Sequence, residues 1–363
     1  MFNMSVFFSV SLAGKTIFFY WSVSPALHHV PFGPHLTTIY ICFTSYCGML
    51  GKVIIMVSVF VLVFGLVKAP AQDTIDKTCQ ILELEWANDI FMSTDRYFTN
   101  GLVLKYYSSF LKKSPSSFIL LPDKKGEITY HGITLTQHFF TPVISYGGFS
   151  PDDRPFASYL LLGHQKVSLN PKKRIKKQSE IQIGILGRYS GGESIQNWIH
   201  ELLPASEPVI GWDNQLNADF ALNYLLKFEH GLFNTKSFDL MSVADVRLGV
   251  PYTDVAGGLK IRIGRFDDYF SNIGIDTEKD WQLYLFAEAD VKYVAYNATL
   301  QGGLSHNSLH IINEIEPLMV QSHIGIVFTK NSFGVELGQY IQSPDFSRGL
   351  PHAWGYMVFR YAF

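Results

Sequence analysis

The sequence predicts an all-β protein, a transmembrane antiparallel β-barrel of about twelve strands, and three observations predict it. Segments of roughly ten residues alternate in character along residues 80–363, as the strands of outer-membrane barrels do. The last of these segments ends the chain on an aromatic residue, Phe363. A candidate export signal precedes them all, and residues 72–363 contain no apolar run of the ~20 residues that a spanning helix needs.

The composition agrees with a β-rich protein in contact with lipid. Aromatic residues make up 15% of the 363 residues and charged residues only 17%, a low charge content for a soluble enzyme. The three cysteines, Cys42, Cys47 and Cys79, lack the spacing of a zinc site or a disulfide framework. A formal charge of −2 without a basic block argues against nucleic acid as a partner.

The first 71 residues contain neither Asp nor Glu and include a secretory pattern. Residues 49–52 supply a basic start, residues 53–67 an apolar core, and residues 69–71 an Ala-x-Ala site. We therefore expect cleavage after Ala71. We also expect that translation naturally starts at or near Met49, so that residues 1–48 come from sequence upstream of the true start codon. A membrane anchor is the alternative, although residues 53–67 are too few to span a bilayer.

The mature protein would then be one barrel domain, residues 72–363, with a charge of −5 because three Lys and no acid are lost from −2. Long polar inserts at residues 114–129, 267–280 and 302–315 predict loops at the barrel rims. An even number of strands closes the sheet and leaves no edge exposed to lipid. The expected strands are residues 81–86, 102–107, 133–139, 159–167, 181–186, 220–229, 240–248, 258–264, 282–296, 319–329, 334–342 and 353–363.

The last expected strand is the most specific topological feature. Its side chains divide into an aromatic-rich face and a second face. A C-terminal Phe that closes such a strand is the pattern outer-membrane barrels present to the barrel-assembly machinery, which is therefore an expected partner. The first face comprises Met357, Phe359, Tyr361 and Phe363, and the second Val358, Arg360 and Ala362.

One short helix is expected among the strands, over residues 190–204. Ser190 and Glu193 have the spacing of a capping box, and Pro204 would end the helix. Gln196 and His200 are four residues apart and therefore project from one face. Most helix histidines are solvated or core residues, but a histidine can also activate water as a general base.

Oxygen-bearing side chains flank the first expected hairpin. Asn88 and Asp89 follow the first strand, and Thr99 opens the second, so their oxygens could converge on a hard cation such as Ca²⁺. The same residue types are ordinary turn formers, and a turn without a metal is the commoner outcome.

Arg154 lies among acids after a Gly-rich stretch, and Glu207 follows the helix. Arg154 could face an anionic head group or pair with Asp152 or Asp153, and Glu207 could orient the His200 ring or bind a cation. The chain contains no Gly-x-Ser-x-Gly elbow and no His-Glu-x-x-His motif, so neither an α/β serine hydrolase nor a zincin is predicted.

Together these runs resemble the outer-membrane lipid A 3′-O-deacylase family. The likeness extends over most of residues 80–363, and its specific motifs lie within residues 86–215. The matching residues are Asn88-Asp89, residues 94–101, Gln137, Thr141-Pro142, residues 153–157, Gly192-Glu193, Gln196, His200 and residues 211–215.

The resemblance implies an enzyme of the Gram-negative outer membrane that removes the ester-linked acyl chains at the 3′ position of lipid A, with Ca²⁺ as cofactor. Its partners would be lipopolysaccharide and the surrounding outer-membrane lipids. His200 would be the water-activating base, with Gln196 and Glu207 beside it (Glu201 is the fallback for Glu207). Asn88 and Asp89 would hold the metal, and Thr99 and Arg154 would contact substrate.

The sequence departs from the family pattern at two points, and one further match is left open. Ser158 stands where the family commonly has Gly after an aromatic-Ala pair, and Ile90 stands where a polar residue can occur. The family's substrate-contacting lysine matches either Lys105 or Lys166.

Two other functions remain open at this point. The first is a Ca²⁺-dependent hydrolase of another lipid, such as a phospholipid. The second is a non-catalytic barrel or small porin in which His200 is a loop residue. A porin needs an open lumen, whereas about twelve strands with inward Tyr, His and Glu side chains should leave little channel.

Overall fold

The computed structural model describes residues 5–12, 15–22, 80–92, 94, 96–143, 150, 152–202, 209–275, 280–305 and 308–363, with the side chains of residues 5–22 and 199–202 outside the description. The expected signal peptide, its cleavage site and Glu207 lie outside the described residues. Contacts divide the chain into two units, Met1–Asp73 and Thr74–Phe363. The first unit contains an antiparallel hairpin of β1 (Ser5–Leu12) and β2 (Lys15–Ser22), which the sequence did not predict.

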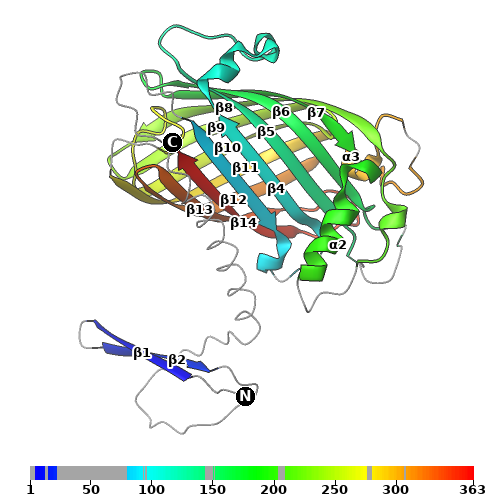
Figure 1. The fold of residues 1–363 in the computed structure, drawn as a ribbon, viewed down its shortest axis with the longest axis horizontal. Helices are drawn as coiled ribbons and strands as arrows, with labels where there is room; N and C mark the ends of the chain where they lie inside the picture. Colours follow the sequence, from blue (N-terminus) through cyan, green and yellow to red (C-terminus); the bar gives the residue numbers. More distant parts are fainter. Residues whose placement is uncertain are drawn as a thin grey trace. The chain divides into compact units, whose positions relative to one another are not determined.

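Twelve strands of the second unit close into an antiparallel barrel (Figure 1), which confirms the predicted fold. Each strand pairs with its neighbours in the sequence, and β14 pairs with β3. Among the described residues, no helix is long and apolar enough to cross a membrane. The strands are β3 (Ile81–Asn88), β4 (Tyr97–Tyr107), β5 (Ile128–Thr141), β6 (Ala157–Asn170), β7 (Ile175–Leu186), β8 (Asp219–Asn234), β9 (Phe238–Gly249), β10 (Tyr252–Arg265), β11 (Trp281–Asn297), β12 (Leu318–Lys330), β13 (Phe333–Gln342) and β14 (His352–Ala362).

The last strand has the two faces that its sequence predicts. Val358 and Ala362 are buried, whereas Met357, Phe359 and Tyr361 are partly exposed on the other side. Phe363 completes the seam, because its carbonyl accepts from the Gln80 amide at 3.1 Å and its amide donates to the Gln80 carbonyl at 2.9 Å. These two bonds join the ends of the barrel chain.

Polar contacts cross the lumen of the barrel. Lys227 Nζ of β8 lies 3.2 Å from Glu288 Oε1 of β11, and the Tyr159 ring of β6 lies 6.2 Å from the Tyr252 ring of β10. Both pairs join strands that are not neighbours in the sheet. Side chains therefore fill space that a porin would leave open.

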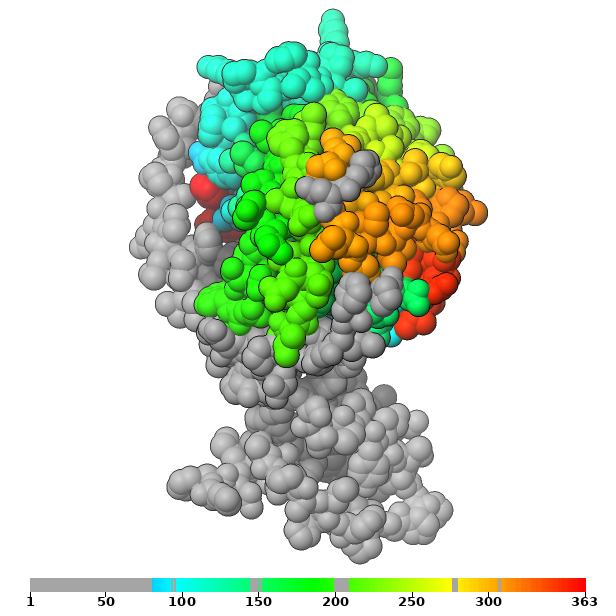
Figure 2. Space-filling model, turned by 90° about the vertical axis from the view of Figure 1, so that its right-hand side faces the viewer, coloured from blue at the N-terminus to red at the C-terminus, as the bar shows by residue number. Residues whose placement is uncertain are grey.

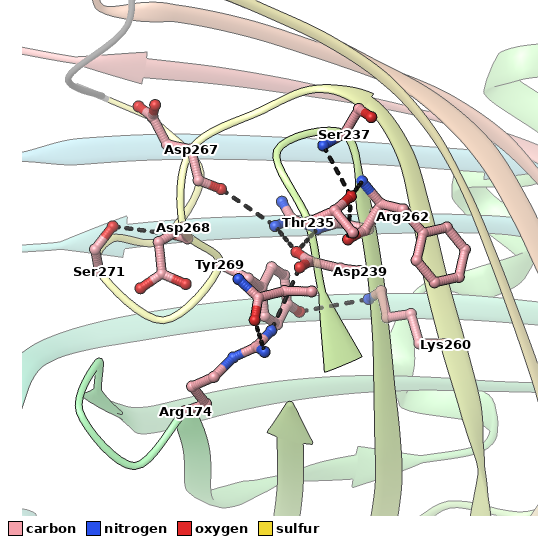
Figure 3. Close-up of polar contacts among 12 residues, drawn as sticks. Arg174, Thr235, Ser237, Asp239, Lys260, Arg262, Asp267, Asp268, Tyr269 and Ser271 are labelled. Carbon is pink, nitrogen blue, oxygen red and sulfur yellow. Dashed lines mark hydrogen bonds and ion pairs between the residues drawn. The ribbon is translucent and has the colours of Figure 1, made fainter. Parts of the chain in front are cut away.

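One end of the barrel, which we call the short-turn end, is closed by the connection after β10. Phe266, Phe270 and Ile275 of this connection are buried. Figure 3 shows it beside the β8–β9 turn, where the Asp239 carboxylate accepts from Arg262 and, at 3.3 Å, from Arg174. The short turns 171–174, 235–237 and 331–332 and both ends of the barrel chain also lie here, as at the periplasmic side of outer-membrane barrels.

The opposite end, which we call the helical end, carries the longer connections with α2 (Gly192–Leu202) and α3 (Ala298–Gln301) (Figure 1). In Figure 2, which looks onto this end, residues near position 300 (orange) lie across the mouth. Leu300 is buried there with Tyr97 and Phe346. The sequence did not predict α3, because a four-residue helix is too short to show a helical period.

The helix carrying Gln196 is confirmed, but its predicted capping box is wrong. A 3-10 turn, η4 (Arg188–Ser190), precedes it, and Gly191 then adopts a left-handed conformation with φ of 83°. The helix consequently begins at Gly192, too late for Ser190 to be its N-cap. Glu193 instead accepts from Gln215 Nε2 at 3.5 Å.

Candidate active site

Apart from the two candidate lysines, the expected site residues that the structure describes lie at the helical end. Asn88 ends β3, and Asp89 begins a 3-10 turn, η1 (Asp89–Met92). Thr99 lies near the start of β4, and Gln196 lies in α2. Arg154 immediately precedes β6. The strand ends thus bring together residues that lie more than a hundred positions apart in the sequence.

Polar side chains replace apolar ones on the outer wall near this end. The exposed residues Leu102, Leu104, Ile133, Leu135 and Leu162 mark the outward positions of β4, β5 and β6. By the alternation of side chains along a strand, six polar residues share that outward direction. These six, which we call the polar band, are Asn88, Asn100, Gln137, Thr141, Ser158 and, through a β-bulge between Phe98 and Asn100, Thr99.

Hydrogen bonds connect the members of the polar band. Thr99 Oγ1 and Thr141 Oγ1 are 2.6 Å apart, which joins β4 to β5. Trp86 Nε1 donates to Asn100 Oδ1 at 3.0 Å, which joins β3 to β4. Most of these side chains are buried although they point outward. Because buried polar groups are costly unless paired, the hydrogen bonds stabilise the polar band beside the apolar outward positions of the same strands.

Two further bonds hold the start of the α2 segment against the outside of the barrel. Gln137 Nε2 of β5 donates to the Ser190 carbonyl at 2.5 Å. The Ser158 and Ser190 hydroxyl oxygens are also 2.5 Å apart. The segment that leads into α2 is therefore fixed to the outward faces of β5 and β6.

Gly192 allows this close approach. A Cβ atom at position 192 would lie 2.5 Å from Ser158 Cβ and 2.9 Å from Trp212 Cη2. Ser158, one of the departures from the family pattern, is thus accommodated because its neighbour on the helix has no side chain. Ser158 was not predicted as a neighbour of the site, although a polar residue at an outward position of a lipid-facing strand is a signal for one.

Gln196 is held in one orientation by Trp212. The Gln196 side chain is buried, and its Oε1 accepts from the Trp212 indole Nε1 at 2.8 Å. Since an indole can only donate, the amide must present its oxygen to Trp212. Gln196 Nε2 is consequently a buried donor, without a hydrogen-bond partner among the described residues.

Trp212 is itself fixed by packing. Its indole is fully buried in a cluster with Phe139, Phe156 and Val209, and its ring centre lies 5.1 Å from that of Phe156. Because Phe139 belongs to β5, this packing fixes Trp212, and with it the Gln196 amide, relative to the barrel wall.

Asn88 and Asp89 have the contacts of turn formers. Asn88 Oδ1 accepts from the Ile90 amide at 2.7 Å, and Asp89 Oδ2 accepts from the Arg96 amide at 2.8 Å. Thr94 Oγ1 lies 3.4 Å from the same carboxylate oxygen. The all-oxygen donor set, with one buried carboxylate, still suits a hard cation better than zinc. In the described part of the chain, no three His, Cys, Asp or Glu residues group as a metal site.

Comparison with known proteins decides the family. The family model described as outer membrane protein LpxR matches residues 55–363. The chain belongs to the LpxR family. The resemblance inferred from the sequence motifs is therefore confirmed, and membership together with the closed barrel supports an outer-membrane location.

Solved structures agree with the fold of an LpxR-family barrel. LpxR from Salmonella typhimurium is similar with a TM-score of 0.63 at 18% identity, over 78% of this chain and 100% of that one. The β domain of the Bordetella autotransporter Brka (TM-score 0.44, 10% identity, 79% and 100% covered) and the NalP translocator domain from Neisseria meningitidis (0.38, 8%, 89% and 100%) are too distant to carry an argument. No match was found among curated proteins.

In this LpxR-family chain Arg154 lies inside the mouth, apart from the polar band. Its guanidinium donates to Thr299 Oγ1 at 2.9 Å, lies 3.5 Å from Asp345 Oδ2, and sits 4.4 Å from the centre of the Phe140 ring. Its acidic partner is thus Asp345, not Asp152 or Asp153 as the sequence suggested. Burial raises the pKa of the Asp345 carboxyl, and Arg154 opposes that effect.

A cavity of about 160 Å³ adjoins Arg154 on the lumen side. Arg247, Asp254 and Lys292 contribute further charges to its lining. Arg154 also lines a smaller pocket with Pro142, Phe156 and Gly211. Its role as a substrate contact stays a prediction.

The remaining expected residues divide into two groups. His200 and Glu201 belong to α2 by backbone, but their side chains lie outside the description, as does all of Glu207. Lys105 and Lys166 are described, and neither lies at the helical end. Lys105 pairs with Glu83 in the lumen at 2.7 Å, and Lys166 lies on the outer wall near the short-turn end.

Proposed function

We propose that the protein is a lipid A 3′-O-deacylase, an esterase that removes the acyl chains at the 3′ position of lipid A in the outer leaflet. Membership of the LpxR family supports lipid A deacylation in the outer membrane. The observation that carries the proposal for this chain is Gln196 Nε2, a buried donor without a partner among the described residues, next to a polar band on the lipid-facing wall.

The outward direction of the polar band suits a membrane lipid as substrate. A site on the outside of the barrel reaches an ester at the membrane interface while the acyl chains stay in the hydrocarbon. A lumen site would instead require the whole lipid to leave the bilayer at a cost of ~0.8 kcal/mol for each CH₂ group exposed.

The reaction is attack of water on the ester carbonyl, followed by release of the fatty acid. We assign proton abstraction from that water to His200, because it lies one helical turn beyond Gln196 in α2. Glu207 would orient the imidazole, with Glu201 as the alternative. The proton taken by His200 then passes to the departing sugar oxygen.

Gln196 Nε2 would stabilise the negative charge that develops on the carbonyl oxygen. Trp212 keeps this donor directed away from the indole, so little reorganisation is needed when the charge forms. Removal of one such donor typically costs ~10²–10³ in rate.

Ca²⁺ is part of the proposal through its expected ligands, Asn88 and Asp89, with Thr99 nearby. When bound, the cation would polarise the ester carbonyl. Without it, the described contacts hold the Asn88 and Asp89 oxygens against backbone amides of their own loop, so metal binding would replace or share these bonds.

The test is the mass spectrum of lipid A from cells that express the protein. We expect loss of the 3′-linked acyl chains, and lipid A of unchanged mass would refute the proposal. His200→Ala should restore the parental spectrum while the folded barrel persists as a heat-modifiable band on a gel. A changed phospholipid profile with unchanged lipid A would instead identify a phospholipid hydrolase.

A further inference from the structure

The connection between β4 and β5, residues 108–127, forms a raised structure on the outside of the barrel, which we call the outer strap. It contains two 3-10 turns, η2 (Ser109–Lys113) and η3 (Pro115–Ile119). Figure 1 shows these turns (cyan) projecting outward from the barrel near the short-turn end, and Figure 2 shows them as a ridge on the barrel surface. The outer strap takes no part in the proposed reaction.

Four polar contacts fasten the outer strap to outward-facing wall residues. Tyr224 Oη donates to the Ile119 carbonyl at 2.9 Å, and the Leu121 amide donates to Ser179 Oγ at 3.0 Å. Lys166 Nζ donates to the Leu121 carbonyl at 2.7 Å. Ser116 Oγ lies 2.7 Å from His164 Nδ1. The strap therefore spans the outer faces of β6, β7 and β8.

These contacts cover a polar patch that would otherwise face lipid. Lys166, His164, Ser179 and the nearby His131 are all buried, although they lie on the same outward face of their strands as the exposed residues Ile133, Leu162 and Ile183. A cation and two imidazoles in direct contact with acyl chains would be costly. The inner side of the outer strap shields these groups from the acyl chains and supplies hydrogen-bond partners to His164, Ser179 and Lys166.

The outer side of the strap combines apolar and basic groups. Phe118 is 85% exposed, Phe110 60% and Ile119 41%, so all three point away from the barrel. Three lysines of the strap, Lys113, Lys124 and Lys125, are exposed as well.

Both acids of the strap are paired with lysines. Asp123 contacts Lys166 and lies 2.9 Å from Lys112, and Glu127 lies 2.5 Å from Lys177. The exposed charge of the strap is therefore basic.

The height of the outer strap matches a membrane interface. Lys166 and Ser179 pair with each other four residues from the 171–174 turn. At ~3.3 Å per residue, the strap therefore crosses the wall about 13 Å from the end of the strands. Aromatic residues gather at this level in outer-membrane barrels, and the lysine side chains are long enough to reach the head groups.

We propose that the outer strap is an anchor for anionic phospholipid head groups in the leaflet at the short-turn end. Phe110, Phe118 and Ile119 enter the boundary of the acyl chains, while Lys113, Lys124 and Lys125 contact lipid phosphates. The inner side of the strap thus covers the polar patch of the wall, and its outer side binds lipid.

The experiment places a fluorophore on the strap of the full chain. Phe118→Cys is labelled with nitrobenzoxadiazole in a background with Cys42, Cys47 and Cys79 replaced by Ser, and the protein is reconstituted in vesicles. Quenching is then compared for nitroxide-labelled phosphatidylglycerol and phosphatidylcholine. We expect quenching by both lipids, with phosphatidylglycerol preferred, and the preference should fall roughly fivefold for each lysine removed.

Two triple variants test whether the preference for phosphatidylglycerol depends on the strap lysines or on any positive charge at the short-turn end. Lys113→Gln/Lys124→Gln/Lys125→Gln should abolish the preference for phosphatidylglycerol. Lys172→Gln/Lys236→Gln/Lys330→Gln removes the same charge from exposed residues at or beside the short turns and should retain it. An equal loss in both variants would overturn the strap as the binding surface.

Other outcomes also contradict the proposal. Quenching of the label by a water-soluble nitroxide and by neither lipid would show that the strap faces water. Protection from both kinds of quencher would show that another protein molecule covers it.

Discussion

At the scale of single residues, the hydrogen bond from Trp212 orients the Gln196 amide on which the proposed site depends. Gln196→Ala removes the buried donor and should lower kcat by ~10²–10³-fold. Trp212→Phe keeps most of the packing but frees the amide to rotate, so it should lower kcat by less. Steady-state rates on lipid A measure both. Trp198→Phe is the control, because Trp198 lies on the same helix and is exposed; an equal loss there would contradict the orienting role of Trp212.

The contact between Gly192 and Ser158 allows a rescue experiment. Gly192→Ala places a methyl group against Ser158 and Trp212 and should displace α2, with a loss of deacylation. Adding Ser158→Gly removes the hydroxymethyl group and should recover part of the activity. If the double variant were no better than Gly192→Ala alone, the contact would not control the position of the helix.

The metal expectation can be tested through Asp89. Chelation should silence the enzyme and added Ca²⁺ should restore it, whereas Asp89→Ala should stay inactive at any Ca²⁺ concentration because the only charged ligand expected is gone. Asp152→Ala, which alters an exposed carboxylate at the same end, should respond to chelation and Ca²⁺ as the parent does. Full activity in excess chelator would refute metal assistance.

At the scale of elements, the docking of the outer strap onto the barrel wall should depend on pH through Asp123. Hydrogen bonds from Lys166 and Lys112 lower the pKa of this carboxyl to about 2. Because this pKa is lower when the strap is docked, the ionised carboxylate stabilises docking at pH values above the ordinary Asp pKa of ~3.9. This stabilisation is lost as the pH falls towards 2.

The same label at position 118 measures the release of the strap. Its fluorescence should be steady between pH 7 and about pH 4 and should change as Asp123 is protonated at lower pH. Asp123→Asn should remove this change of fluorescence below about pH 4. An unchanged step in that variant would assign the transition to another group.

The elements also show what sequence patterns can and cannot predict. The strands were predictable because their period of two is set by a wall with lipid on one side and packed polar groups on the other. The start of α2 was predicted wrongly, because the left-handed turn at Gly191 and the bond between Ser158 and Ser190 depend on a strand more than thirty residues away. Gln196 followed from the family pattern, but its orientation needed Trp212, whose contact is tertiary.

At the scale of the whole molecule, the barrel should behave as a closed body. Because Lys227–Glu288 and other contacts cross the lumen and the β10–β11 connection fills one end, we expect no steady conductance in planar bilayers. The control is a porin of known conductance reconstituted in the same way. A stable open level from this protein would revive the pore hypothesis.

The alternation of side chains along the wall has a consequence for how such a protein can diverge. On β4, Lys105 points into the lumen and pairs with Glu83, whereas Asn100 points outward and bonds Trp86. Residues of the proposed site and residues of the packed lumen thus alternate along a single strand and face opposite sides of the wall. A substitution at an outward position therefore changes the surface that meets lipid and leaves the packing of the interior in place.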